Sequence, residues 1–281
     1  MGDRCDMGYW SFKLNLVYIF KYICTMSTVT PIKINQLLQK LPSGSLFFSS
    51  WMRENGISYD LQRRYRDSEW LTPIGAGVMA RTGENPSIYG ALSSMNKQTH
   101  KHFYVGGLTA LELTGYTHFV PMGRPVVYVG HPKDEWVPSW LRKRDWGVDL
   151  LVVTSEYFDT GTGITSMMQG TFEIQVSTPE RAFMECLNLA PRQYNLMDLY
   201  YVMEQLTTLR PGLVQTLLEQ NLSVKMKRLF LFMAEKAGHA WFSDLDLQKI
   251  DTGSGKREIV PNGVYDSKYQ IVIPEELKNY E

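Results

Sequence analysis

The chain has few cysteines, no excess of charge of either sign and no long apolar run. Its three cysteines, Cys5, Cys24 and Cys186, lack the spacing of metal ligands or of a disulfide framework. Lys and Arg number 29, as do Asp and Glu, so the formal net charge of +0 gives no indication of a chain that coats nucleic acid or a membrane surface. The apolar fraction of 44% is typical of a globular protein, and the cysteine usage indicates the reducing cytoplasm.

The first 30 residues lack the features of a membrane anchor or a secretory signal. Residues 14–20 are apolar, but Lys13 and Lys21 bracket them, and a spanning helix needs about 20 such residues. No small-residue cleavage pattern follows the run. We therefore expect residues 1–30 to be an extension from an over-extended translation start, with Met26 as the true beginning. A dispensable amphipathic helix is the second interpretation and a membrane anchor the last.

Residues 31–96 contain helix and hairpin signals in a distinctive order. A first helix is expected at 34–41, and the amphipathic run at 45–52 predicts a second that stops at Asn55-Gly56. Ser58 then occupies an N-cap position before a basic helix at 59–67. The segment 70–81, with glycines at its centre, reads as two strands of a hairpin. This order predicts a winged helix-turn-helix DNA-binding domain.

The spacing of the basic helix separates an inner face from an outer one. Leu61 and Tyr65 lie four residues apart and can pack inward, whereas the outer face would touch a major groove. The predicted DNA contacts are the N-cap, four outer residues and one residue of the wing: Ser58, Tyr59, Gln62, Arg63, Arg66 and Arg81. A solvated charged face is the alternative. Seven Lys/Arg against five Asp/Glu give this domain a net charge of only +2, so it should bind modestly as a monomer and gain from dimerising on DNA.

Residues 97–281 read as a larger mixed α/β domain with a helical carboxy-terminal part, so the predicted class is α+β. Strands are expected at 125–129, 149–154 and 171–176. Ser177-Thr178-Pro179-Glu180 begins a helix, and further helices are expected at 196–207, 211–220 and 224–236. A short strand follows at 269–274.

Three parts of the chain together resemble the AbiEi-type antitoxins. They are the winged unit, Tyr104-Val105-Gly106-Gly107-Leu108-Thr109-Ala110-Leu111, and Gln175-Val176-Ser177-Thr178-Pro179-Glu180-Arg181-Ala182. The resemblance covers roughly residues 31–277. It implies the antitoxin of a type IV toxin–antitoxin, or abortive infection, system of phage defence. Such a protein represses its own promoter and counteracts a cognate nucleotidyltransferase-like toxin, in general without a stable complex. Double-stranded DNA and that toxin are the implied partners, and neither a cofactor nor catalysis is implied.

Three basic clusters allow more than one interpretation. Lys97, His100, Lys101 and His102 form a solvated loop or an auxiliary phosphate contact, because histidines two residues apart do not share a helix face for a metal. Arg142, Lys143 and Arg144 lie between two tryptophans and read as a structural turn or a nucleic-acid surface. A third patch, Lys225, Lys227 and Arg228, remains open.

One enzymatic alternative remains, a metal-dependent nuclease guided to DNA by the same winged unit. Asp149 precedes an apolar strand, and Glu173-x-Gln175 lies on a later one, in the manner of nuclease carboxylates that hold Mg²⁺. Gln175 replaces the lysine of that pattern. No other catalytic motif is present, and Cys186 lies on an apolar helix stripe, which indicates a core residue.

Overall fold

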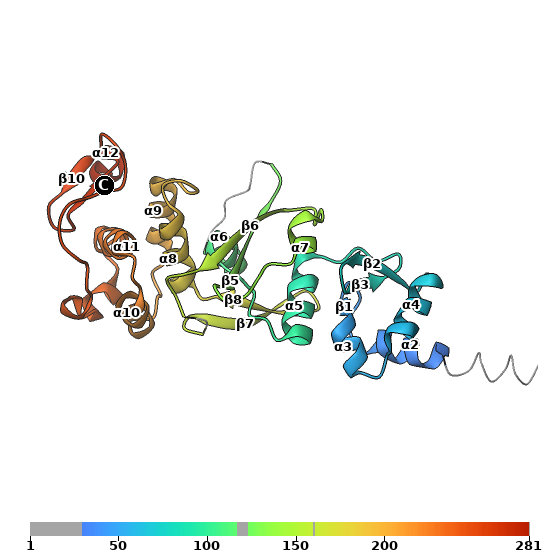
Figure 1. The fold of residues 1–281 in the computed structure, drawn as a ribbon. Helices are drawn as coiled ribbons and strands as arrows, with labels where there is room; N and C mark the ends of the chain where they lie inside the picture. The colour runs from blue at the N-terminus through green and yellow to red at the C-terminus, as the bar shows by residue number, and fades with distance from the viewer. Residues whose placement is uncertain (1–29, 117–122, 160, 281) are drawn as a thin grey trace, which may run out of the picture. The chain divides into compact units, whose positions relative to one another are not determined.

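The computed structural model describes residues 30–116, 123–159 and 161–280, and the chain divides into two compact units (Figure 1). The first unit is Met1–Pro86 and the second is Ser87–Glu281. The expected extension, with its start at Met26, lies outside the described residues except for Thr30. Among the described residues, each helix is too short or too polar to cross a lipid bilayer.

The first unit has the element order of a winged helix-turn-helix. Its elements are α2 (Thr30–Gln39), β1 (Leu46–Phe48), α3 (Ser49–Glu54), α4 (Tyr59–Asp67), β2 (Leu71–Gly75) and β3 (Val78–Arg81). The three strands form an antiparallel sheet in the order β1-β3-β2, so β2 and β3 make the predicted hairpin, or wing. The predicted α+β class, with a winged unit ahead of a larger mixed one, is confirmed.

A small apolar core joins the helices of this unit to its sheet. It consists of Ile34, Phe47, Met52, Ile57, Tyr65, Leu71 and Met79. The turn between α3 and α4 sets the angle at which these helices meet. Gly56 has a φ of +82°, a left-handed conformation that glycine adopts without strain, and Ile57 N–H donates to Met52 O at 2.9 Å. The predicted helix stop at Asn55-Gly56 is therefore confirmed.

The predicted single helix at 45–52 is wrong in its first half. Leu46–Phe48 form β1, in which Leu46 pairs with Ala80 of β3, and α3 begins only at Ser49. All three residues of β1 are buried, so the strand lacks the apolar–polar alternation of a half-exposed strand. A short apolar run of this kind cannot be assigned to helix or strand from its periodicity.

The second unit is built on a five-stranded mixed sheet in the order β6-β5-β4-β8-β7 (Figure 1). Its strands are β4 (Tyr104–Val105), β5 (Val126–Pro132), β6 (Asp149–Ser155), β7 (Ile164–Gln169) and β8 (Phe172–Ser177). Strands β5 and β6 are parallel, as are β4 and β8, and the other neighbours are antiparallel. Strands β5, β6 and β8 occur where the sequence predicts them. Strand β7 was not predicted, because its polar residues break the apolar alternation.

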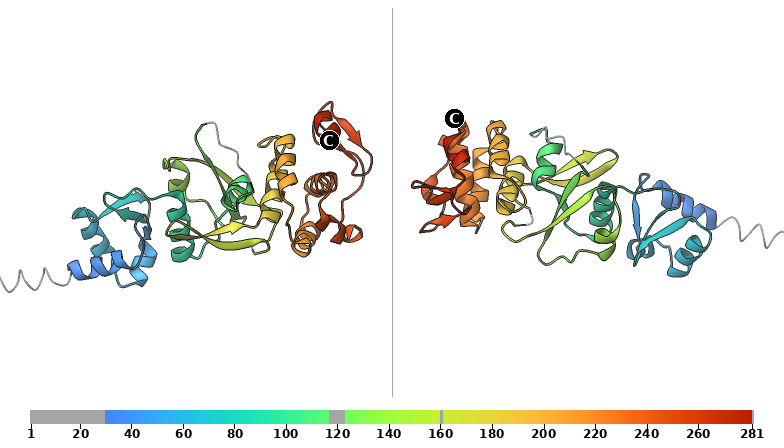
Figure 2. Two further views of the ribbon diagram at one scale, coloured as in Figure 1. Left: turned by 180° about the vertical axis from the view of Figure 1, so that it is seen from behind. Right: turned by 90° about the horizontal axis from the view of Figure 1, so that it is seen from above.

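Helices α5 (Ile88–Thr99) and α6 (Gly107–Leu113) cover opposite faces of this sheet (Figures 1 and 2). The buried stripe of α5, formed by Ile88, Leu92 and Met95, belongs to a helix that packs on β8. The sequence assigned this segment to the winged domain and placed the boundary at residue 96. Its packing instead groups it with the second unit, which begins at Ser87. Helical periodicity identifies the stripe but not the sheet that covers it.

The rest of the second unit is mainly helical. It contains α8 (Pro179–Leu189), α9 (Leu196–Gln205), α10 (Pro211–Gln220) and α11 (Val224–Lys236), after the short α7 (Ser139–Lys143) that joins β5 to β6. Two 3₁₀ turns, η1 (Ala240–Asp244) and η2 (Leu247–Lys249), precede a small sheet of β9 (Arg257–Glu258), β10 (Val264–Asp266) and β11 (Ile271–Ile273), and α12 (Glu275–Asn279) follows. The helices predicted at 211–220 and 224–236 have the predicted bounds, and α9 ends two residues early.

Candidate nucleic-acid interface

Helix α4, the second helix of the helix-turn-helix, begins at the predicted cap. Ser58 has extended backbone angles, and its Oγ accepts the N–H of Leu61 at 3.3 Å. This bond satisfies one of the N–H groups that a helix start leaves without a partner. The hydroxyl of Ser58 can still donate its own hydrogen to an acceptor such as a phosphate oxygen.

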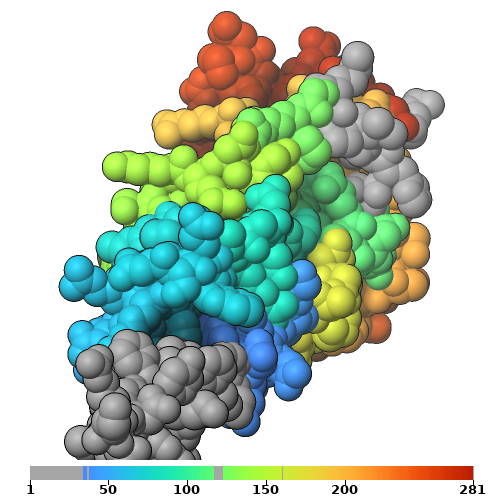
Figure 3. Space-filling model, turned by 90° about the vertical axis from the view of Figure 1, so that its right-hand side faces the viewer, coloured from blue at the N-terminus to red at the C-terminus, as the bar shows by residue number. Residues whose placement is uncertain are grey.

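The outer face of α4 presents an aromatic and basic surface. Tyr59 is 55% exposed and the side chain of Arg63 is 76% exposed. Arg66 is half-buried, with Nη1 3.7 Å from Met79 Sδ of the wing. The opposite face is anchored by Tyr65, which is only 2% exposed. Figure 3 faces the surface of the first unit, in blue to cyan.

Gln62 does not lie on this outer face, contrary to the sequence prediction. Its side chain is 1% exposed, and Nε2 donates to Ser49 O and Ile57 O, each at 3.0 Å. The amide therefore binds the main chain at the start of α3 and in the turn before α4. Gln62 stabilises the helix-turn-helix from within and is unavailable to a base edge.

Arg81 is also engaged inside the unit rather than presented by the wing. Its guanidinium donates to the carbonyls of Leu38 and Leu41, the second at 2.7 Å, and pairs with Glu84 at 3.2 Å. Its side chain is 19% exposed. These bonds fasten the end of α2 to the wing and hold Arg81 inside the unit, so we do not include it among the proposed DNA contacts.

The partner of Arg81 is held in its charged form. Burial alone would raise the pKa of Glu84, but hydrogen bonds from Gly44 N–H and Ser43 Oγ, together with the charge of Arg81, lower that pKa below its ordinary value. The loop after α2 and the loop after β3 are thereby linked through one carboxylate.

Two acidic residues lie among the outer residues of α4. Asp67 pairs with Arg63 at 3.9 Å, with both side chains at least 70% exposed, and Asp60 occupies the first turn. An exposed pair of this kind contributes little stability, so Arg63 can leave it at small cost. The guanidinium of Arg53, in the last turn of α3, lies 5.6 Å from the ring centre of Tyr59, within the range of a cation–π contact.

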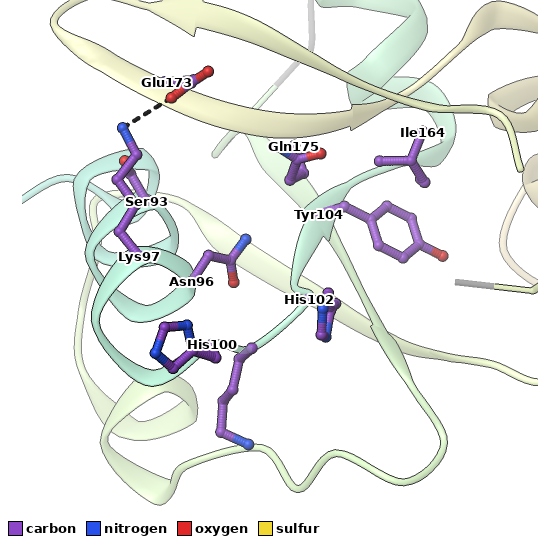
Figure 4. Close-up of a pocket in the computed structure, with 10 residues that line it drawn as sticks. Ser93, Asn96, Lys97, His100, His102, Tyr104, Ile164, Glu173 and Gln175 are labelled. Carbon is purple, nitrogen blue, oxygen red and sulfur yellow. Dashed lines mark ion pairs between the residues drawn. The ribbon is translucent and has the colours of Figure 1, made fainter. Parts of the chain in front are cut away.

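The cluster at 97–102 lines a pocket of about 310 Å³ in the second unit (Figure 4). Lys97, on α5, is paired with Glu173 of β8 at 2.9 Å, and His102 Nδ1 lies 2.7 Å from Glu135. Lys101 Nζ lies 5.1 Å from the Trp136 ring centre. Lys97 therefore already has a carboxylate partner, and within the described residues no group of three His, Cys, Asp or Glu could hold a metal.

The carboxylates of the nuclease alternative do not converge. Asp149 begins β6, and Glu173 lies on β8, with β5 and β4 between them. Three strand spacings of about 4.8 Å keep them at least about 14 Å apart across the sheet, too far to share one Mg²⁺. Each is paired with a cation instead, Asp149 with Arg124 at 3.4 Å and Glu173 with Lys97 at 2.9 Å.

The two other basic clusters differ from each other. In the patch on α11 the side chains bind main-chain carbonyls: Lys225 those of Asn188 and Ala190, Lys227 that of Asp251, and Arg228 those of Thr252, Gly255 and Gln270. That patch is therefore part of the interior. Around α7, Trp140 and Trp146 are each 8% exposed, which confirms them as core residues, while Arg142 and Lys143 remain exposed.

The two late sequence motifs meet at one buried carboxylate. Glu185 accepts Gly107 N–H at 2.9 Å, Ser177 Oγ at 3.0 and 3.1 Å, and Arg181 Nε at 2.9 Å. Arg181 is wholly buried and its Nη2 also donates to Tyr104 Oη at 3.1 Å. The motifs therefore join β4, β8 and α8 and have a structural role.

Close packing explains the glycines of the first motif. A Cβ added at Gly106 would lie 2.4 Å from Glu185 Oε2 and 2.6 Å from the Tyr128 ring, and one at Gly107 would lie 2.6 Å from the same ring. Cys186, the neighbour of Glu185, is fully buried as predicted, and this burial raises the pKa of its thiol well above the ordinary value.

A winged helix-turn-helix whose second helix exposes a tyrosine and arginines defines a DNA-binding transcriptional regulator. The chain belongs to the AbiEi antitoxin family. A family model described as "Transcriptional regulator, AbiEi antitoxin, Type IV TA system" matches residues 124–274, and one described as "Transcriptional regulator, AbiEi antitoxin N-terminal domain" matches residues 30–122. The expected family is thus confirmed, and the protein is an antitoxin that regulates transcription in a type IV toxin–antitoxin system.

Comparison with solved structures supports the fold. The crystal structure of the RV2827C protein from Mycobacterium tuberculosis is similar over 85% of this chain and 89% of that one, with a TM-score of 0.57 and 16% identity. At this identity the likeness shows the fold alone. No curated protein sequence matches the chain.

Proposed function

We propose that the protein binds double-stranded DNA of its own promoter by placing α4 in the major groove. The proposed contacts are Ser58, Tyr59, Arg63 and Arg66. The observation that supports this most directly is the exposure of Tyr59 and Arg63 on a helix whose other side is anchored by Gln62 and Tyr65. At 100° per residue, Tyr59, Arg63 and Arg66 fall within about 60° of one another around the helix axis.

The charge of this surface supports modest affinity. Asp60 and Asp67 lie beside the arginines and repel phosphate, and Arg63 must exchange Asp67 for a phosphate on binding. Two copies on a repeated operator would double the number of phosphate contacts. We therefore propose dimeric binding in the cytoplasm, where promoter DNA is found, and we expect strong salt dependence.

The test is the affinity for a promoter fragment, measured by fluorescence anisotropy over a series of salt concentrations. Arg63→Ala with Arg66→Ala should weaken binding, and each phosphate interaction that the substitutions remove should reduce the slope of log K against log salt by about 0.9. Asp67→Asn should act in the opposite direction, because it frees Arg63 and removes a repulsive charge. Lys133→Ala, an exposed lysine of the second unit, is the control for a change in net charge.

Thermal melting by circular dichroism verifies that each variant is folded, because Arg66 also contacts Met79. Unchanged affinity and slope in the folded double variant would remove Arg63 and Arg66 from the interface.

We also propose that the second unit counteracts a cognate nucleotidyltransferase-like toxin without catalysis and without a stable complex. The family supports the antitoxin role, and the separation of Asp149 from Glu173 argues against a nuclease. Incubation with the promoter fragment and Mg²⁺ tests this directly, since cleavage that disappears in Glu173→Gln would favour the enzymatic alternative.

A further inference from the structure

Strand β6 is an edge of the five-stranded sheet and is apolar over most of its length (Figure 1). Leu150, Leu151, Val152 and Val153 follow one another, and each is only half-buried. Its neighbour β5 has a comparable composition but is buried at six of its seven positions. Among the described residues no strand pairs with the outer side of β6, and its apolar side chains stay partly uncovered.

The main chain of β6 offers an open row of hydrogen-bonding groups. Asp149 N–H donates to Pro125 O at 2.8 Å, so Asp149 directs its main chain toward β5. Because this direction alternates along a strand, Leu150, Val152 and Thr154 direct their N–H and C=O groups outward. Pairing with β5 continues without a register shift along the whole strand, so no bulge protects this edge.

A groove of about 590 Å³ lies beside the first half of β6 and has a basic wall. Arg142 and Lys143, in the last turn of α7, are exposed, and within the described part of the chain neither has an ion-pair partner. The two carboxylates of the groove, Asp145 and Asp149, both pair with Arg124. Two positive charges of the wall are therefore free to attract an anionic occupant.

We propose that β6 and this groove bind an acidic, extended segment of a partner protein by strand addition. The segment's main chain pairs with the outward groups of Leu150, Val152 and Thr154. Its apolar side chains cover the half-buried leucines and valines, and its carboxylates lie against Arg142 and Lys143. Main-chain pairing gives affinity and the basic wall selects acidic sequences. This proposal is independent of DNA binding by α4.

The same observations favour a protein segment over other occupants. Every second outward group of β6 is a carbonyl oxygen, which repels a phosphate backbone. The four aliphatic side chains also provide no aromatic ring on which a base could stack.

The probe is a fluorescein-labelled peptide of alternating valine and glutamate, about eight residues long so that it spans β6. Anisotropy with the full chain should give saturable binding that weakens with salt. Arg142→Glu with Lys143→Glu should reduce the affinity at least about tenfold. Val152→Pro should do the same, because it removes an outward N–H and leaves the bonds to β5 intact. Lys133→Glu, a single lysine-to-glutamate change at an exposed position outside the groove, should have no effect.

A second peptide keeps the result interpretable if Val152→Pro does not fold. The same sequence N-methylated at alternate residues retains its charge and side chains but cannot pair with an edge, and the unaltered protein should bind it at least about tenfold more weakly. Equal binding of both peptides, or no saturable binding, overturns the proposal. So does an oligonucleotide that competes and depends on Arg142 and Lys143 but not on Val152. A dimer in sedimentation velocity that Val152→Pro dissociates would identify a second copy as the occupant and overturn it too.

Discussion

At the scale of single residues, a polar side chain that is buried and hydrogen-bonded within its own unit has a structural role, whereas an exposed one is available for binding. Gln62 and Arg63 are adjacent on one helix, yet Gln62 binds two main-chain carbonyls of its own unit and Arg63 is exposed. Sequence spacing placed both on the outer face. The spacing cannot identify the buried contact of Gln62, because the acceptor Ser49 O lies 13 residues away in the sequence. The contact depends on the angle between α3 and α4.

Replacement of Gln62 should therefore affect stability more than recognition. Gln62→Leu fills the same space but leaves Ser49 O and Ile57 O without their donor, which should cost about 1–3 kcal/mol of unfolding free energy. Urea denaturation of the full chain measures this cost, with the exposed Gln39→Leu as the matched control. A variant as stable as the parent but defective in promoter binding would return Gln62 to the interface.

The buried pair of Arg181 and Glu185 should have a larger effect. Arg181→Met leaves Glu185 charged and buried without its guanidinium, which should cost about 3–5 kcal/mol. Glu185→Gln in addition should recover part of the loss, because it removes the unpaired charge. Arg63→Met, which breaks an exposed pair, should cost less than about 1 kcal/mol. Denaturation midpoints of the four proteins test the comparison, and an Arg181→Met cost equal to that of Arg63→Met would contradict the assigned role of the network.

At the scale of elements, local chemistry was predictable and long-range partners were not. The cap at Ser58, the stop at Gly56 and the start of α8 at Pro179 each depend on one or two residues, and the sequence located all three. The division of residues 45–52 into a strand and the start of a helix depends on β3, a strand far along the chain that pairs with Leu46–Phe48. Likewise, the carbonyls that Arg81 binds lie 43 and 40 residues away, so its role required the structure.

The contact between α8 and α10 should be sensitive to acid. Glu180, 3% exposed, accepts the N–H, Nε and Nη2 of Arg210 at 2.9–3.0 Å. Burial opposes its ionisation, but the bonds from Arg210 outweigh burial and lower the pKa of Glu180 below its ordinary value of 4.5. A lowered pKa in the folded state gives stability that is complete above the unfolded value and is lost as the pH falls through the folded one.

The unfolding free energy of the parent should fall as the pH is lowered from about 6 to about 3, and Glu180→Gln should make this fall smaller. The effect should be about 1 kcal/mol, since the side chain of Arg210 is 62% exposed and solvent screens the pair. Part of the acid dependence should remain, because the pKa values of Glu84, Asp159 and Asp266 are lowered as well. Urea titrations at several pH values provide the measurement, with the exposed Glu54→Gln as control. If the unfolding free energies of Glu180→Gln and the parent change with pH to the same extent, the assignment is contradicted.

At the scale of the whole molecule, the two proposed activities belong to different units of the chain. The proposed operator contacts all lie on α4, within Met1–Pro86, whereas the Glu185 network and the β6 groove lie within Ser87–Glu281. Each unit has its own sheet, and the core of the second includes α5. The residue at which the chain is cut therefore decides whether a fragment can fold.

A fragment of residues 87–281 should melt cooperatively and protect cells from the cognate toxin while the promoter stays derepressed. A fragment that begins at residue 97 lacks most of α5 and uncovers the face of β8 on which Ile88, Leu92 and Met95 are buried. Each missing side chain should cost about 1.5–3 kcal/mol, which is enough in sum to unfold a marginally stable unit. Circular dichroism melts and a toxin rescue assay compare the two fragments. If both melt alike, α5 is not part of this unit's core. If the longer fragment folds but gives no protection, neutralisation requires the winged unit, and the separation of activities is wrong.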